Sequence, residues 1–339
     1  MVSHKGGVRL LDLELEGEIE TLYVRNPGAS VNWKVNVLRP QNELRLPEWI
    51  QGQIVEVIKR AATRYPKEKT YAELNHGVHS LLVRVDFSLD EEEIMPYEVE
   101  ESPAGIGISS KICSGFKERL FGLGWPKKTK VLIYPPRRKG GDDYLWTDIL
   151  DPQSLNDEYL LAPRINDLEA VRGLEKIRRK SVWPVTYREM KSYGSGWLWK
   201  EVDDPTPEKL AQLSNEYARS GSPGIVFKGD GSGNKKVRIV LFAKGKKEAK
   251  QWLGTTHFGT FKMRTITGEV CEWKPLYLQK FYWPLRVRVN GSNYFGIYRV
   301  YTGFDIKASQ WKILGGFLNA RTSLSIHGAS DAIFIPVIP

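Results

Sequence analysis

Alternation of polar and apolar residues is the main pattern along the chain, and it predicts strands at both ends. RLLDLELEGEIETLYV (9–24) and NWKVNVLR (32–39) have the period of two that is typical of a strand with one buried face. A helical spacing of apolar residues is found in 46–66, with Pro47 near its start, and again in 207–220. Further segments with strand character are GIVFK (224–228), KVRIVLF (236–242), PLYLQKFY (275–282), LRVRVN (285–290), YFGIYRVY (294–301) and AIFIPVI (332–338).

The middle of the chain mixes the two patterns. SLLVRVDFSLDEEEIMPYEVEES (80–102) predicts two strands around an acidic turn. GISSKICSGFKERLFGLG (107–124) predicts one helix that ends at Gly122 or Gly124. Helix and strand patterns alternate between about 105 and 175, which favours a small α/β layer there. The chain as a whole is predicted to have an α+β fold.

Composition narrows the class of protein. The longest apolar runs, such as AIFIPVI, have the length of a strand and are too short for a membrane span. The N-terminal twenty residues are too charged for a secretory signal. Cys113 and Cys271 are the two cysteines, and they form neither a disulfide framework nor a metal-ligand spacing. We therefore expect a cytoplasmic protein without a membrane partner.

The formal net charge of +10 results from 50 Lys and Arg against 40 Asp and Glu. The basic residues stand in short clusters at 126–130, 137–139, 176–180 and 244–250, and no RNA-binding or helix-turn-helix signature accompanies them. A nucleic-acid partner is one interpretation of this charge. The favoured interpretation is that the basic clusters form solvated faces together with a site for phosphates.

The stretch FKGDGSGNKKV (227–237) joins two strand segments through small and polar residues. The N–H groups of a Gly-rich turn suit phosphate oxygens, and Lys228 at the end of its strand could neutralise a phosphate. A plain surface hairpin with an exposed lysine is the alternative. A third interpretation takes KGDG as the motif of nucleotidyltransferases, in which the lysine takes AMP covalently. The later Glu-Gly and Lys-x-Lys motifs of those enzymes have no good counterpart here.

Acidic residues gather on the two strands predicted in 80–102. Alternation places Arg84 and Asp86 on one face of the first strand, and Glu98 and Glu100 on one face of the second. Mg²⁺ prefers such carboxylate oxygens together with substrate phosphates. A solvated polar face on a hairpin is the alternative explanation. We refer to these two segments as the acidic strands.

The acidic strands resemble, in residue types and spacing, the Mg²⁺-binding strands of glutathionylspermidine synthase-like ATP-grasp ligases. In ordinary ATP-grasp enzymes these strands come near the C-terminus, whereas in this group the order is circularly permuted and they come first. The chain has the permuted order, since Lys228 and YLQKF (277–281), which resembles an adenine hinge, follow the acidic strands. The resemblance thus implies an ATP-grasp-like fold with circularly permuted order of the Mg-binding strands.

The C-terminal segments also resemble the closing strands of that group, including the Gly-Gly that precedes Arg321 in GGFLNARTS. The resemblance covers about 80–339 as scattered short motifs. Two features depart from the family: its third Mg²⁺ ligand is typically Asn, where Glu100 stands here, and its amidase domain is absent.

The resemblance implies an ATP-dependent ligase that joins a small-molecule or peptide carboxylate to an amine through an acylphosphate, with ATP and Mg²⁺ as cofactors. Trp197 and Trp199 could flank a base, although core packing is the more common role of such residues. The implied residues are the metal ligands Asp86, Glu98 and Glu100; the ATP-binding residues Lys228, Gly229, Gly231, Ser232, Gly233, Gln279, Lys280 and Phe281, with Lys180 favoured over Lys191 as a second phosphate lysine; and the catalytic residues Arg84 and Arg321.

The same motifs suggest a division of the chain, whose substrates and oligomeric state the sequence leaves open. The expected parts are an N-terminal α/β segment of unassigned role (1–80), the Mg-binding strands (81–110), a small α/β layer (111–175), a lid subdomain (176–275) and the C-terminal core strands (276–339).

Overall fold

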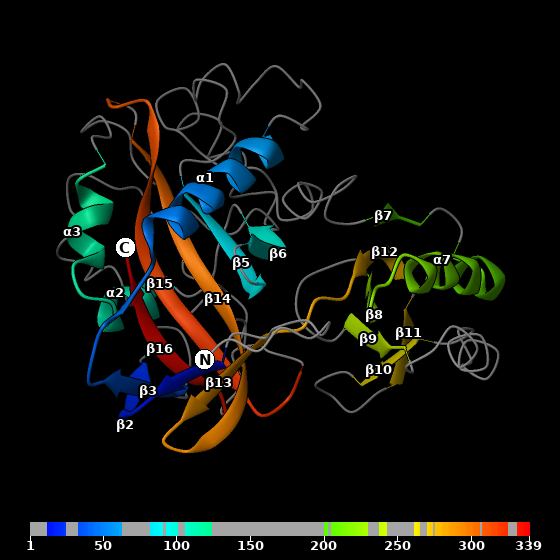
Figure 1. Cartoon of the computed structure of the whole chain (residues 1–339), viewed down its shortest axis with the longest axis horizontal. Helices are drawn as coiled ribbons and strands as arrows, with labels where there is room; N and C mark the ends of the chain where they lie inside the picture. The colour runs from blue at the N-terminus through cyan, green and yellow to red at the C-terminus, as the bar shows by residue number, and fades with distance from the viewer. Residues whose placement is uncertain are drawn as a thin grey trace, which may run out of the picture. The chain divides into compact units, whose positions relative to one another are not determined.

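The structure is a computed structural model of the whole chain, drawn in Figure 1. It forms two compact units, 1–193 with 284–339 (unit 1) and 194–283 (unit 2), and each is described by itself. The five-part division expected from the sequence stays a prediction. The described residues are 12–24, 33–62, 82–90, 93–100, 106–123, 200–202, 205–229, 237–242, 261–264, 270–273, 275–305, 307–324 and 331–339.

Unit 1 is built on a mixed sheet of ten described strands in the order β1-β13-β14-β15-β16-β3-β2, in which β5 pairs with β14 and β6, and β4 pairs with β16. The long strands β14 and β15 run through the middle of this unit (Figure 1). The sheet and its helices confirm the α+β prediction. The elements are β1 (Asp12–Leu15), β2 (Gly17–Val24), β3 (Trp33–Pro40), β4 (Leu44–Arg45), α1 (Glu48–Ala62), β5 (Leu82–Asp90), β6 (Glu93–Glu100), α2 (Ile106–Ile112), α3 (Phe116–Phe121), β13 (Leu285–Val289), β14 (Ser292–Asp305), β15 (Gln310–Arg321) and β16 (Ile333–Ile338).

Helix α1 follows the apolar spacing of its sequence. Ile50, Ile54 and Ile58 recur every four residues and are all buried. Glu48 lies in the first turn, and Lys59 and Arg60 lie in the last, so the charged side chains complement the helix dipole. The helix packs on β5, β6 and β15.

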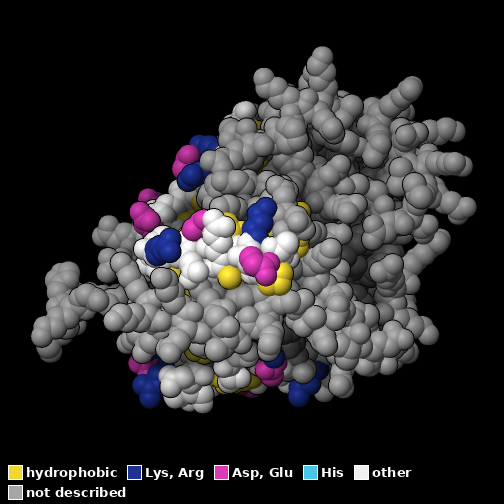
Figure 2. Space-filling model, turned by 90° about the vertical axis from the view of Figure 1, so that its right-hand side faces the viewer, with side chains coloured by type: hydrophobic (Ala, Val, Ile, Leu, Met, Phe, Trp, Pro, Cys, Tyr) yellow, Lys and Arg dark blue, Asp and Glu magenta, His cyan; other side chains and the backbone are white. Residues whose placement is uncertain are grey.

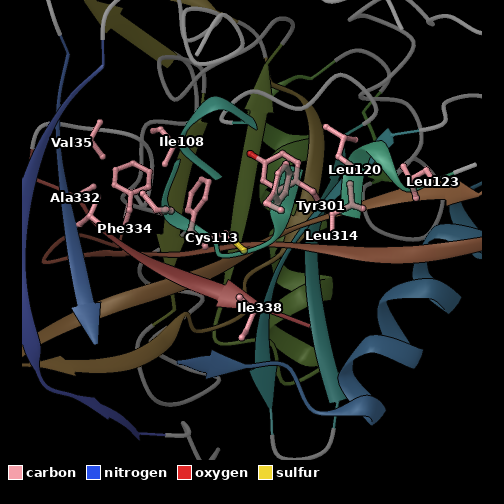
Figure 3. Packing of buried hydrophobic residues seen from close by; sticks show 14 residues of the cluster. Val35, Ile108, Cys113, Leu120, Leu123, Tyr301, Leu314, Ala332, Phe334 and Ile338 are labelled. Carbon is pink, nitrogen blue, oxygen red and sulfur yellow. The ribbon is translucent and has the colours of Figure 1, made fainter. Parts of the chain in front are cut away.

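One face of the sheet is covered by α2 and α3. Their buried residues, which include Ile108, Phe116 and Leu120, pack on Tyr301 of β14 and Phe334 of β16 (Figure 3). The ring of Phe116 meets that of Tyr301 edge-on, with centroids 5.6 Å apart. This packing fixes which residues of the central strands share the helix-covered face.

The prediction of one helix over 107–124 is wrong, because α2 and α3 are separate helices. The chain turns at Gly115, whose φ of 68° lies in the left-handed region that favours glycine. Gly122 ends α3, as the sequence predicts. The rest of the alternating helix and strand patterns expected up to about 175 lies outside the described residues, which end at 123 and resume at 200.

Unit 2 contains a four-stranded sheet in the order β7-β12-β8-β9 and a separate β10–β11 pair. Its helix α7 begins after Thr206, whose side chain accepts a hydrogen bond from Lys209 N, and Pro207 takes the first helical position. Leu210 and Leu213 of α7 pack on the sheet. The elements are β7 (Lys200–Glu201), α7 (Pro207–Arg219), β8 (Gly224–Gly229), β9 (Val237–Leu241), β10 (Phe261–Arg264), β11 (Val270–Trp273) and β12 (Pro275–Lys280).

Candidate functional site

The acidic strands pair as an antiparallel hairpin, β5 with β6. The register places Asp86 directly opposite Glu98 and Arg84 opposite Glu100, so these residues share one face of the sheet. The register shifts after Asp86, and the shift leaves Tyr97 as an extra residue on β6. Glu98 is half-buried, while the side chain of Glu100 lies outside the described part of the structure.

Asp86 is held by two arginines. Arg84 donates from Nε to Asp86 Oδ1 at 2.6 Å and from Nη2 to Oδ2 at 2.9 Å. Arg299 of the neighbouring strand β14 lies opposite Asp86, with 3.5 Å between its Nε and Oδ2. The side chains of Arg84 and Asp86 are 4% and 7% exposed, so the pair is almost fully removed from water. A two-pronged contact of this kind fixes the plane of the carboxylate as well as its position.

Arg84 has a second neighbour on the same face. Its guanidinium carbon lies 6.0 Å from the centroid of the Tyr301 ring, at the limit of a cation–π contact. Burial raises the pKa of Tyr301 to about 12, and the arginine charge opposes that rise. Tyr301 therefore keeps its proton at neutral pH.

Three further polar residues lie on this face, and the sequence analysis missed them as site residues. Ser88 and Asn319 are fully buried, and the Nε atom of Arg299 is buried as well. Among the residues that the structure describes, the buried side-chain nitrogen and oxygen atoms without a hydrogen-bond partner are Ser88 Oγ, Arg299 Nε and both carboxamide atoms of Asn319. A polar residue inside the apolar run ILGGFLNA (313–320) is the signal that could have pointed to Asn319.

Arg321, the second predicted catalytic residue, stands at the end of β15. Its Nε donates to both carboxylate oxygens of Asp331, at 2.8 Å and 3.0 Å. Its side chain is 15% exposed, against 49% for Asp331. The contact is thus an ion pair at the rim of the sheet.

In unit 2, Lys228 and the predicted adenine hinge meet on one sheet. β8 pairs antiparallel with β12, with Lys228 opposite Tyr277 and Val226 opposite Gln279. The side chains of Lys228 and Gln279 therefore share the face turned away from Phe227, which packs with α7. β8 also pairs antiparallel with β9, which confirms the two strands predicted on either side of the glycine-rich segment.

The remaining hinge residues have different environments. Lys280 lies opposite Ile225 on the other face from Lys228, and its Nζ is 5.5 Å from the centroid of the Tyr282 ring. Phe281 is buried, and its N–H donates to Gly224 O at 3.1 Å. The backbone of Gly229 ends β8 opposite Pro275. Lys180, Lys191, Trp197, Trp199, Gly231, Ser232 and Gly233 lie outside the described residues.

The predicted Mg²⁺ ligands fit a cation in part. Within the described ranges no three His, Cys, Asp or Glu side chains group as a complete metal site. Asp86 and Glu98 nevertheless bring two carboxylates to one place, and Mg²⁺ commonly takes only one or two of them besides phosphate oxygens and water. Asp86 Oδ1 keeps a second lone pair beside its bond to Arg84 Nε, whereas Oδ2 has both Arg84 Nη2 and Arg299 Nε next to it.

The four basic clusters on which the nucleic-acid alternative rests lie outside the described residues, so that alternative stays a prediction. Figure 2 shows Lys and Arg side chains interspersed with Asp and Glu on the described part of the face it displays. Within the described ranges, no helix has both the length and the apolar character needed to cross a membrane.

Comparison with known proteins leaves the family open. No model of a protein family matches the chain, and no curated protein matches it either. Among solved structures, it is similar to a candidate gamma-glutamylcysteine synthetase from Methylobacillus flagellatus KT. The identity is 12%, the TM-score is 0.44, and the match covers 86% of this chain and 88% of the other. This similarity is too distant to assign the chain to a family.

Proposed function

We propose that the chain is an ATP-grasp ligase that joins a carboxylate to an amine at the expense of ATP. The register of β5 and β6 supports this proposal most directly, because it brings the carboxylates of Asp86 and Glu98 to one face. When bound, Mg²⁺ would supply charge neutralisation for the phosphates of ATP. Arg84 would act through Asp86, since its guanidinium holds that carboxylate in place.

Unit 2 contributes a second line of support. Lys228 and Gln279 share one face of the β8–β12 pair, which is the arrangement expected if a lysine binds phosphates beside an adenine hinge. In the proposal Lys228 holds phosphate oxygens as a point charge, and Gln279, Lys280 and Phe281 border the base. The same proposal expects the glycine-rich segment 229–234 to close over the phosphates.

The proposed reaction has two steps. The substrate carboxylate attacks the γ-phosphorus, the bond from that phosphorus to the bridging oxygen breaks, and ADP leaves. The amine then attacks the acyl carbon of the acylphosphate, the bond from carbon to the phosphate oxygen breaks, and an amide and phosphate are formed. The proton lost by the amine passes to solvent or phosphate. Arg321 is proposed to stabilise the charge on the transferred group.

The test is an ADP-release assay with ATP, Mg²⁺ and pooled amino acids and small peptides. Glu98→Gln should lower the rate by about 100-fold or more, because it removes a charge next to the phosphates. Glu93→Gln on the same strand is the matched control, since Glu93 is exposed. Asp86→Asn is a poorer probe. It leaves Arg84 buried without its carboxylate, a change that costs about 3–5 kcal/mol of stability.

Three outcomes would contradict the proposal. Equal ADP release by the Glu98→Gln and Glu93→Gln variants would contradict the assignment of Glu98 as a metal ligand. An added mass of one AMP on Lys228 after incubation with ATP would favour the nucleotidyltransferase alternative. Steeply salt-dependent binding of nucleic acid, without ATP turnover, would favour the nucleic-acid alternative.

A further inference from the structure

The polar atoms that lack hydrogen-bond partners in the described part of unit 1 are clustered. Asp86, Arg299 and Phe317 form one row across β5, β14 and β15. In the next row on the same face, Asn319 lies opposite Ile297, and the register of β5 carries Ser88 into that row. Ser88, Arg299 and Asn319 thus stand on three adjacent strands, and we call them the Asn319 cluster.

Hydrogen bonds within the described residues do not explain this cluster. A buried polar group without a partner destabilises a fold, and each such group in a native protein calls for an explanation, such as strain, a bound water, ion or ligand, or a functional role. Thr302 is also on β14 and fully buried, and it shows how a buried hydroxyl is ordinarily satisfied, because it donates a hydrogen bond to Val83 O at 3.1 Å. In the Asn319 cluster, Ser88 Oγ and both amide atoms of Asn319 have no such hydrogen bond within the described residues. Arg299 Nε has none either, and only its 3.5 Å ion-pair contact with Asp86 Oδ2 is present.

The unsatisfied atoms specify the chemistry of an occupant. Arg299 Nε and Asn319 Nδ2 are donors that suit a carboxylate, while Asn319 Oδ1 is an acceptor that needs an N–H. Ser88 Oγ can serve either group. The Arg299 side chain is 18% exposed, so this end of the cluster is in contact with solvent.

We propose that the Asn319 cluster is the seat of the substrate carboxylate, and that it takes a carboxylate with an N–H donor beside it, as an amino acid has. The reaction at this seat rests on the proposed ligase function, whereas the binding does not. Arg299 is also an ion-pair partner of Asp86, so the seat adjoins the predicted metal ligands on the same face.

Binding is tested by saturation-transfer NMR on the full chain, without nucleotide or Mg²⁺. The probes are the twenty amino acids, acetate and methylammonium. We expect at least one amino acid to bind about tenfold or more tightly than acetate, since acetate lacks the N–H donor. Asn319→Leu and Arg299→Met should each weaken that binding by about tenfold or more. Thr302→Val is the matched control and should leave that binding unchanged, because the hydroxyl of Thr302 donates to the backbone carbonyl of Val83 and is not part of the Asn319 cluster.

The proposal is overturned if no amino acid binds the wild-type chain, or if Asn319→Leu leaves the affinity of a bound amino acid unchanged. These results differ from a failure of the ligase function. Amino-acid binding that depends on Asn319, without ADP release in the assay above, would support the proposed carboxylate seat and contradict the proposed ligase function. ADP release, together with amino-acid binding that Asn319→Leu does not change, would support the ligase function and contradict the carboxylate seat.

Discussion

Asn319→Leu should make the free protein more stable, which is the opposite of what most buried substitutions do. Leucine has the same branched side-chain skeleton as asparagine with bulkier methyl groups, and it removes two polar atoms that have no partner among the described residues. Leaving a buried polar group unsatisfied costs about 1–3 kcal/mol, so removing it should stabilise the fold by a similar amount. Imperfect packing of the new side chain offsets part of this stabilisation. We therefore expect the free energy of unfolding to rise by about 1–2 kcal/mol.

The assay is differential scanning calorimetry of the whole chain, following the transition of unit 1. For a unit of this size, 1 kcal/mol corresponds to about 2–4 °C in Tm. Thr302→Val is the matched control, because it is nearly isosteric, fully buried and in the same sheet, yet removes a hydroxyl that is hydrogen-bonded. It should lose about 0.5–1.5 kcal/mol. If Asn319→Leu lowers Tm as Thr302→Val does, the amide is a satisfied structural group and the reasoning fails.

Three other predictions concern unit 1. Gly315→Ala should cost about 1–3 kcal/mol in urea unfolding, because φ is +96° and the new Cβ would lie 2.7 Å from Cys113 Sγ. Burial raises the pKa of Cys113, so its thiol should resist alkylation in the native protein at pH 8 and react after denaturation, as peptide mass mapping can check. The hydrogen bond from Lys312 lowers the pKa of Asp305, which contributes stability above the unfolded pKa of about 3.9 that is lost as pH falls through the folded value. Asp305→Asn should therefore lower stability at pH 7 and have little effect at pH 2, as urea titrations at the two pH values would show.

Elements fixed by local pattern could be predicted from the sequence. The hairpin of β5 and β6 is one example, since two alternating strands around an acidic turn can pair in few ways. Helices α1 and α7 are others, because apolar spacing and residues near their first turns, such as Pro47 and Pro207, marked their positions. The broken helix over 107–124 was missed, because apolar periodicity continues through Gly115 while its backbone does not.

The candidate site was predictable only where its residues are neighbours in sequence. Arg84 and Asp86 were placed on one face by alternation, and they lie on one face. The contact of Arg299 with Asp86 depends on how β14 pairs with β5, and these strands are far apart along the chain. Asn319 was hidden for another reason, because a lone polar residue in an apolar strand is informative only when its burial and its missing partners are known.

The arrangement of unit 1 gives the two proposals a common geometry. Neighbouring strands lie about 4.8 Å apart, so Arg299 on β14 stands about 5 Å from the strand of Asp86, and Asn319 on β15 stands one strand further. Glu98 stands one strand beyond Asp86 on the other side. The predicted metal ligands and the proposed carboxylate seat therefore span about 14 Å across four strands, β6, β5, β14 and β15. That width suits a small substrate whose carboxylate faces a phosphate at the acidic side of the face. A much larger substrate, such as a folded protein, would need a surface outside this face.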